Sequence, residues 1–204
     1  MTQQPTDRID TATEILAAAK RALLVVGYAR LSTRAIAEQA EVPLSQIHYH
    51  FGSKQALVLA VLEEENRRLL DRQEHMYESE LPIWQQWEQA CDFLEDDLAS
   101  GYVLVLHEMI AAGWSEPEIA QAVWDQLQGW YRLLTEVARR AGDRLGGLGP
   151  FTPAEIGALA GLSFIGAESL ILLGIDEETL PARSALRKLG PVIRALEETT
   201  GDEG

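Results

Sequence analysis

The chain has 204 residues and a net charge of −15, and its abundant Ala and Leu indicate a soluble, mostly helical protein with a sizeable core. Its single cysteine, Cys91, excludes an intrachain disulfide, and the start of the chain lacks the basic and apolar runs of a signal peptide. No stretch of about 18 uninterrupted apolar residues is present, so we expect a cytoplasmic protein that does not enter a membrane.

The acidic charge argues at first against nucleic acid as a partner, because nucleic-acid binding depends on neutralising phosphates. Residues 1–54, however, carry six Lys or Arg and five Asp or Glu, a net charge of +1. The other 150 residues carry 11 bases and 27 acids, a net charge of −16. Such an acidic C-terminal part would repel DNA from everywhere except the N-terminal part. The alternative is that these acids only keep the protein soluble.

A first helix is predicted from a capping box, Thr11 with Glu14, to Gly27, which suits a left-handed C-terminal cap. The stretch 31–54, LSTRAIAEQAEVPLSQIHYHFGSK, then predicts two short helices joined by a tight turn. The second of these helices would bury one face. The side chains on its other face would stay exposed and fit a DNA major groove. An ordinary helical hairpin is the alternative. The exposed side chains are Pro43, Leu44, Ser45, Gln46, His48 and Tyr49.

The chain after this unit predicts further helices, three of which have clear starts. Ser53 caps the first of them, and two capping boxes, Ser115 with Glu118 and Thr152 with Glu155, open two others. These further helices are expected over residues 54–77, 82–98, 102–113, 115–142, 153–174 and 181–199.

The two C-terminal helices predict a dimer. The helix over 153–174 is apolar nearly all round, which in a soluble protein predicts contact on every side. Together with the last helix, it suggests a self-complementary patch that pairs about a two-fold axis into a four-helix bundle. A second copy would also let a DNA-reading head read two half-sites. The alternative is that this hairpin completes the core of a monomer.

The run from about residue 11 to 62, above all STRAIAEQAEVPLSQIHYHFGSKQAL, resembles the N-terminal DNA-binding domain of TetR-family transcriptional regulators. The resemblance implies an all-α fold of about nine helices, with a helix-turn-helix DNA-binding domain at 1–54 and a helical ligand-binding and dimerisation domain at 55–204. It implies a homodimeric repressor that binds a palindromic double-stranded DNA operator and is released by a small apolar effector. The alternative to release by an effector is a DNA-binding dimer without a small-molecule effector.

By motif position, the resemblance places phosphate contacts at Thr33, Tyr49, His50 and Lys54. Base contacts fall on the second short helix, where the amide of Gln46 can bond an adenine edge twice. The residues at base-reading positions are Pro43, Leu44, Ser45, Gln46 and His48.

Three positions depart from the pattern of the family and bear on the operator sequence. Glu41 stands where the turn usually has Gly, so the turn loses a residue that is free to take a positive φ. Pro43 stands where a polar cap is usual, and His48 stands where a Tyr is usual.

An apolar ligand pocket is predicted between the helices of the C-terminal part, with a simply filled core as the alternative. Because many acids lie nearby in sequence, we expect a neutral or cationic effector rather than an anion. The apolar lining would be Trp87, Met109, Trp124, Tyr131 and Phe164, and the polar groups His107 and Glu168.

We expect no cofactor and no metal. His48 and His50 diverge by about 200° on a helix and have no third ligand nearby in sequence. An enzyme is the alternative from another class, but no GxSxG, HExxH, phosphate-loop or Cys–His pattern is present, so we expect no enzymatic activity.

Overall fold

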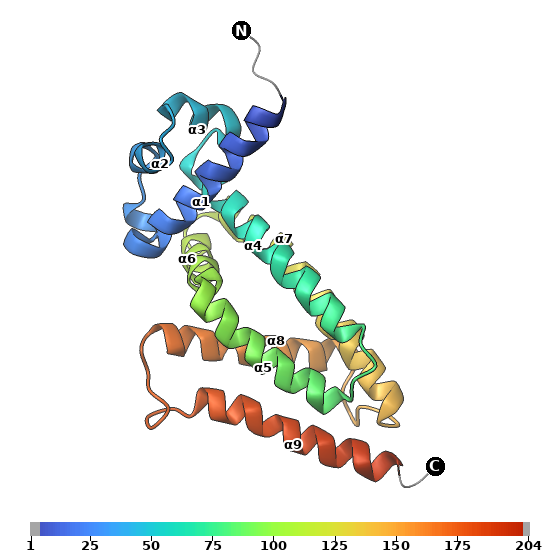
Figure 1. Cartoon of the computed structure of the whole chain (residues 1–204). Coiled ribbons are helices and arrows are strands. Elements are labelled where there is room, and N and C mark those ends of the chain that lie inside the picture. The colour runs from blue at the N-terminus through green and yellow to red at the C-terminus, as the bar shows by residue number, and fades with distance from the viewer. Residues whose placement is uncertain (1–4, 202–204) are drawn as a thin grey trace. The chain divides into compact units, whose positions relative to one another are not determined.

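The structure of the chain, a computed structural model, describes residues 5–201 (Figure 1). Within this range it contains nine helices and no strand, so the predicted all-α fold is confirmed. The helices are α1 Pro5–Arg30, α2 Thr33–Gln39, α3 Leu44–Phe51, α4 Lys54–Tyr77, α5 Ile83–Ser100, α6 Tyr102–Gly113, α7 Pro117–Arg144, α8 Pro153–Leu172 and α9 Ala182–Gly201.

The helices form two compact units, between which the chain crosses three times. The first unit holds the chain up to Arg67 together with Gly101–Asp125. The second unit holds Arg68–Ser100 together with the chain from Gln126 onward. Helices α4 and α7 therefore each contribute to both units. The predicted boundary between residues 54 and 55 divides the chain by function, whereas the two units are defined by packing. This boundary stays a prediction.

The first unit is held together by apolar side chains where α2, α3 and α6 contact α1. Leu23 of α1, Ile36 of α2 and Ile47 of α3 are fully buried. The start of α6 approaches α1 most closely, because Gly101 has a φ of +80° and a Cβ there would lie 2.4 Å from a methyl carbon of Leu24. Glycine is required at that position both by the backbone conformation and by the space.

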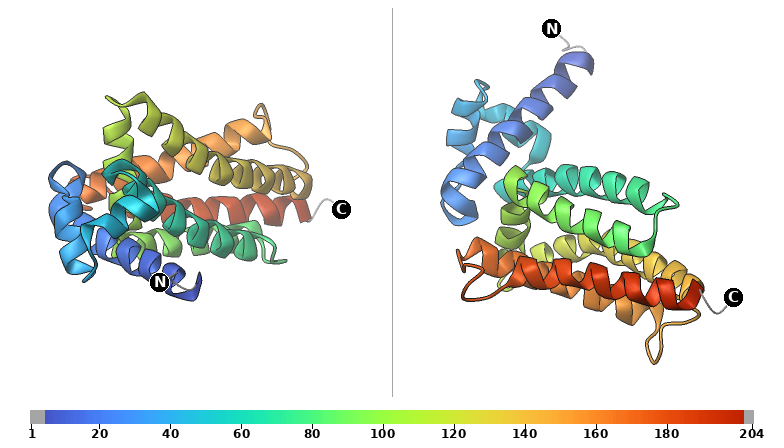
Figure 2. Two further views of the ribbon diagram at one scale, coloured as in Figure 1. Left: turned by 90° about the horizontal axis from the view of Figure 1, so that it is seen from above. Right: turned by 60° about the horizontal axis from the view of Figure 1, so that its bottom comes forward.

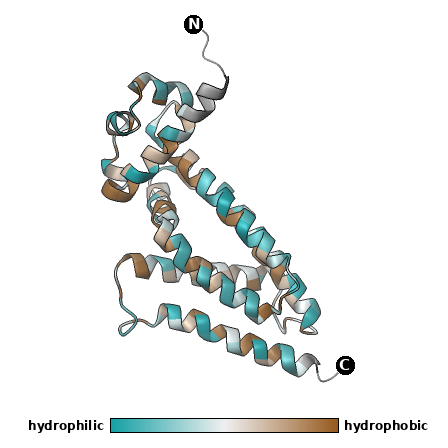
Figure 3. Cartoon of the chain, in the orientation of Figure 1, coloured by the Kyte–Doolittle hydropathy of each residue, from teal (hydrophilic) through white to brown (hydrophobic). Residues whose placement is uncertain are grey.

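In the second unit, α5 and α9 lie side by side (Figure 2). Helix α9 alternates hydrophilic and hydrophobic residues along its length (Figure 3), as expected of a helix with one face on a neighbour. Trp87 of α5 packs against Phe164 of α8 with ring centroids 5.4 Å apart, and its Nε1 donates to the Leu186 carbonyl at 2.7 Å. A common apolar core thus joins α5, α8 and α9.

Two predicted helix starts are confirmed. The hydroxyl of Thr152 accepts from the N–H of Glu155 at 3.3 Å, while the Glu155 carboxylate accepts from the N–H of Thr152 at 2.8 Å. At the start of α4, the hydroxyl of Ser53 accepts from the N–H of Ala56 at 3.0 Å. These side chains satisfy N–H groups that have no partner inside the helix.

Two other predicted starts are wrong. Helix α1 already begins at Pro5, ahead of the expected start at Thr11. The capping box of Ser115 does not form, because its hydroxyl donates to the Ala112 carbonyl of α6 at 3.2 Å and α7 begins at Pro117. A serine that closes one helix in this way is not available to cap the next.

Helix α8 packs on the unit by one side only. Gly157 lies so close to α7 that a Cβ there would be 2.9 Å from the backbone nitrogen of Thr135. Leu159 and Leu162, on another side, are 53% and 60% exposed within one chain, so the expected contact on every side, which includes a second copy, stays a prediction. Among the described residues, α8 is the one helix with the length and apolar composition of a membrane span, a test that a core helix of a soluble protein also passes.

Candidate functional site

Helices α2 and α3 are joined by a Schellman turn centred on Glu41. The N–H of Val42 donates to the Ala37 carbonyl at 3.0 Å, and the N–H of Glu41 donates to the Glu38 carbonyl at 3.2 Å. This hydrogen-bond pattern places the residue after the helix end in the left-handed region, and Glu41 has a φ of +55°. Glu41, which stands where Gly is usual, therefore takes the positive φ itself.

Helix α3 is anchored by its inner face and presents its outer face. Ile47 is fully buried, whereas Tyr49 is 58% exposed. The structure places four of the nine predicted DNA-contacting residues in exposed positions and five in half-buried ones. The exposed residues are Pro43, Ser45, His48 and Tyr49, and the half-buried residues are Thr33, Leu44, Gln46, His50 and Lys54.

Two of the predicted base-reading side chains already have specific positions in the protein alone. The Oε1 atom of Gln46 is enclosed and has no hydrogen-bond partner among the described residues. His48 places its Nδ1 3.2 Å from the Gly52 carbonyl oxygen, at the end of α3. Gln46, unlike His48, therefore has an unmet hydrogen-bonding capacity, in the region where the sequence predicts a base contact.

The predicted phosphate ligand Lys54 is held at the first residue of α4. Its Nζ donates to the Tyr28 carbonyl at 3.1 Å and lies 4.5 Å from the centroid of the Tyr28 ring. On the other side of the same residue, the N–H of Tyr28 donates to the Glu108 carboxylate at 3.1 Å. Sequence reasoning missed the contact between Tyr28 and Glu108, since they are 80 residues apart and no motif joins them.

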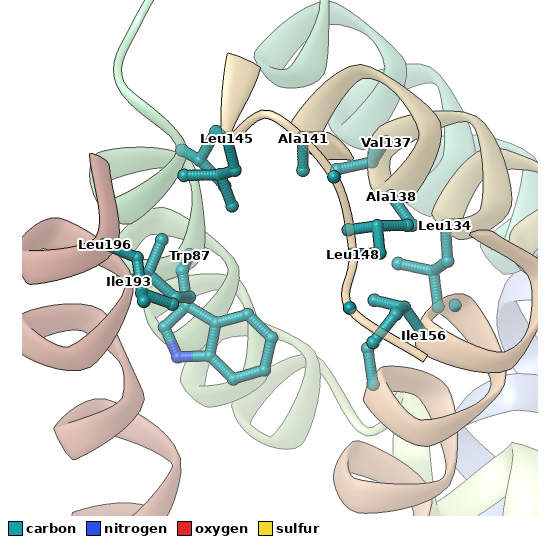
Figure 4. A pocket seen from close by; sticks show the side chains of 15 residues that line it. Trp87, Leu134, Val137, Ala138, Ala141, Leu145, Leu148, Ile156, Ile193 and Leu196 are labelled. Atoms are coloured by element: carbon teal, nitrogen blue, oxygen red, sulfur yellow. The ribbon is translucent and has the colours of Figure 1, made fainter. Parts of the chain in front are cut away.

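A cavity of about 400 Å³ lies inside the second unit, between α5, α7, α8 and α9. Figure 4 shows the indole of Trp87 in this cavity, with Ile193 and Leu196 on one side and Leu134 and Ile156 on the other. The remaining lining is aliphatic or glycine, and includes Leu145, Gly147, Leu148 and Gly149 of the loop between α7 and α8. A space lined in this way favours an apolar guest.

The seven residues predicted to line a ligand pocket are divided between the two units. His107, Met109 and Trp124 belong to the first unit, and the other four belong to the second. Of the seven, Trp87 lines the cavity of Figure 4. The signals that could have indicated this cavity are the small residues of α7 and α8 that face it, namely Ala138, Ala141, Gly157 and Ala160.

A cluster of charged groups is half-buried elsewhere in the second unit. The Arg72 guanidinium donates to the Asp97 carboxylate at 2.7 Å and stacks 4.1 Å from the centroid of the Phe93 ring. Burial raises the pKa of Asp97 to about 6, because desolvation outweighs the attraction of Arg72 and the nearby Glu168 adds repulsion. Glu168 of α8 is itself buried, at 8% exposed.

Comparison with known proteins identifies residues 15–61 with the family model described as bacterial regulatory proteins, tetR family. A TetR transcription regulator from Haloarcula marismortui is 20% identical, with a TM-score of 0.74 over 90% of this chain and 97% of that one. A putative transcriptional regulator from Saccharomonospora viridis in complex with choline is 20% identical, with a TM-score of 0.72 over 88% and 94%.

The transcriptional regulator FadR from Bacillus subtilis in complex with stearoyl-CoA is 13% identical, with a TM-score of 0.68 over 89% of this chain and 96% of that one. At these identities the three structures share the fold of this chain. A comparison with curated protein sequences gives no match.

Proposed function

We propose that this chain is a transcriptional regulator of the TetR family, a repressor that binds a palindromic operator as a homodimer and leaves it when a small apolar molecule binds. The observation that carries the proposal is the geometry of α3, whose inner face is buried at Ile47 while Tyr49 and the start of the helix are exposed. We place the regulator in the cytoplasm, where DNA is accessible, and assign it no enzymatic activity.

The DNA-binding part of the proposal assigns two kinds of contact to the residues around α3. Tyr49 and Lys54, with Thr33 and His50, bind phosphates and set the position of the helix on the duplex. The residues from Pro43 to His48 face the base edges, which requires Gln46 to turn its amide out of its enclosed position. Tyr49→Ala is expected to weaken binding to all duplexes alike, and Gln46→Ala to relax preference at one base pair. Equal binding by wild type and Tyr49→Ala would contradict this assignment.

The dimer part of the proposal is supported by exposed apolar side chains on α8 and α9. Leu159 and Leu162 of α8, and Val192 of α9, are each between 53% and 60% exposed. A monomer gains nothing from such exposure, whereas two copies paired about a two-fold axis would bury these side chains in a four-helix bundle.

Sedimentation tests the dimer. Leu162→Glu with Val192→Glu is expected to give a monomer, because four unpaired carboxylates would be buried in the interface. The matched control is Trp114→Glu, since Trp114 is 84% exposed but lies in the first unit. A dimer that survives the double substitution, or that Trp114→Glu also disrupts, would contradict this assignment.

The effector part of the proposal is supported by the cavity of Figure 4. Its lining offers apolar surface and no charged side chain, so the effector that it fits is small and neutral. Two neighbours in fold were solved with small molecules, one with choline and one with stearoyl-CoA. For this chain, the lining favours the uncharged, hydrocarbon-like part of such molecules.

Tryptophan fluorescence tests the effector site with 1-decanol and naphthalene as probes. Binding is expected to change the emission of Trp87, and to release DNA in the same concentration range. Trp87→Phe should lose this signal, whereas Trp124→Phe, a matched change in the first unit, should keep it. Ala138→Phe fills the cavity and should abolish the response. If the probes bind but never release DNA, the chain is a DNA-binding dimer without an effector at this site.

A further inference from the structure

The carboxylate of Glu108, on α6, lies against a break in α1. Gly27 interrupts the helix with a φ of +72° and a ψ of 164°. A Cβ at this position would lie 2.8 Å from Oε1 of Glu108. Directly after the break, the N–H of Tyr28 donates to Oε2 of Glu108 at 3.1 Å. The break takes the N–H of Tyr28 out of helical geometry, and α6 supplies the acceptor that the helix no longer provides.

Tyr28 then connects this contact to the start of α4. Its carbonyl accepts from Nζ of Lys54 at 3.1 Å, and its ring lies under the same ammonium group. A lysine ammonium has three donors, so Lys54 can hold Tyr28 and a phosphate oxygen at the same time. The ammonium group of Lys54 thus contacts Tyr28, and Tyr28 contacts Glu108.

The start of α6 contacts α1 on the other side of the same break. Gly101 is packed against Leu24, and Glu108 bonds Tyr28, so the two contacts lie on either side of Gly27. The chain passes from the second unit into the first between Ser100 and Gly101, directly before α6. Helix α6 is therefore covalently continuous with the unit that holds the cavity, while its side chains hold the broken end of α1.

We propose that Glu108 is a positioning residue for DNA binding, which through Tyr28 holds Lys54 where it meets a phosphate. A shift of α6 that separates Glu108 from Tyr28 frees the turn after Gly27 and removes the support of Lys54. The proposal rests on the proposed DNA-binding function. It adds a defined route by which the position of α6 changes the affinity for DNA. In this route the Glu108 carboxylate holds the N–H of Tyr28, and the Tyr28 carbonyl holds the Lys54 ammonium group.

The dependence of DNA affinity on salt tests this route, because its slope counts phosphate contacts. Each contact contributes about 0.9 to the slope of log K against log salt concentration. Loss of one Lys54 contact in each protomer of a dimer should therefore flatten the slope by about 2 and lower the affinity about 10-fold. Fluorescence anisotropy with a labelled duplex, selected from a random pool by the wild type, measures both.

Glu108→Ala is expected to flatten the slope. Glu108→Gln keeps an acceptor for the N–H of Tyr28, so its slope should be close to that of the wild type. Glu108→Asp keeps the charge but shortens the side chain, so it provides the same test if Glu108→Ala does not fold. In a Lys54→Ala background, Glu108→Ala should have no further effect on the slope. The matched control is Glu65→Ala, which breaks the 2.7 Å ion pair between Glu65 and Lys20 in the same unit and should leave the slope unchanged.

The outcomes separate this route from the proposed function. A wild type that binds no duplex contradicts DNA binding itself. If the wild type binds DNA, and both Glu108→Ala and Glu108→Asp show the same slope as the wild type, the role of Glu108 is overturned. Flattening by Glu108→Ala that persists in the Lys54→Ala background overturns the route through Lys54.

Discussion

Replacing Glu41 by Gly should stabilise the protein, because the turn between α2 and α3 forces this residue to a φ of +55°. A side chain in the left-handed region costs about 1–2 kcal/mol. Glycine avoids that cost but loses about 0.4–1 kcal/mol more conformational entropy on folding. The exposed side chain of Glu41 makes no hydrogen bond or ion pair within the described residues that would be lost. We therefore expect Glu41→Gly to raise the free energy of unfolding by about 0.5–1 kcal/mol.

Thermal unfolding at a fixed protein concentration measures this difference. For a chain of this length, the expected gain corresponds to a rise of about 1–4 °C in Tm. Glu41→Gln removes the charge and keeps the backbone restriction, so its Tm should match that of the wild type. Glu38→Gly places glycine inside α2 and should lower the Tm. A Glu41→Gly variant that is no more stable than Glu41→Gln would refute the reasoning from backbone strain.

Three further predictions concern single sites. The pKa of Asp97, raised from 3.8 to about 6, means that the folded state binds the proton more tightly, so the free energy of unfolding should fall by about 1–3 kcal/mol as pH rises from 4 to 6. Urea unfolding of wild type and Asp97→Asn across this range should show that fall in the difference between the two proteins, because the other carboxylates titrate in both, and a rise of that difference would contradict it. Gly157→Ala should destabilise by about 1–3 kcal/mol because its Cβ meets the backbone of Thr135, whereas Gly190→Ala, which meets a flexible side chain, should not lower the urea midpoint. Gln46→Ala should cost about 1–3 kcal/mol of discrimination at one base pair, and unchanged preference in a binding selection would mean that the amide stays enclosed.

The sequence was sufficient to predict the elements that depend on local signals. The capping box of Thr152 with Glu155 and the cap at Ser53 act within a few residues, and both form as predicted. The capping box of Ser115 has the same spacing but fails, because the preceding helix offers the Ala112 carbonyl to its hydroxyl. Spacing alone does not reveal such competition between neighbouring helices.

The turn at Glu41 shows how tertiary packing overrides the preference of one residue. A glutamate is less free than a glycine to take a positive φ, yet two backbone hydrogen bonds of the turn hold Glu41 there. Ile36 of α2 and Ile47 of α3 are both fully buried, and α2 and α3 contact each other, so packing of the two helices constrains the turn that joins them.

The cavity and the contacts of Glu108 depend on residues that are distant in the sequence. Helices α5, α7, α8 and α9 each supply part of the cavity lining, so periodicity within one helix shows which face is apolar but not what it meets. The sequence-based assignment of the pocket relied on bulky aromatic residues, whereas the observed cavity lies where small residues face one another. Of the predicted lining, Trp87 reaches this space.

Selection of bound duplexes from a random pool by the full-length protein tests the central claim most directly. Two heads on a two-fold symmetric dimer predict an inverted repeat, with half-sites about one helical turn apart or a multiple of it. The enriched duplexes should bind two protomers, and duplexes with one half-site should bind far more weakly. Enrichment of a single site without symmetry, or no enrichment at all, would contradict the account.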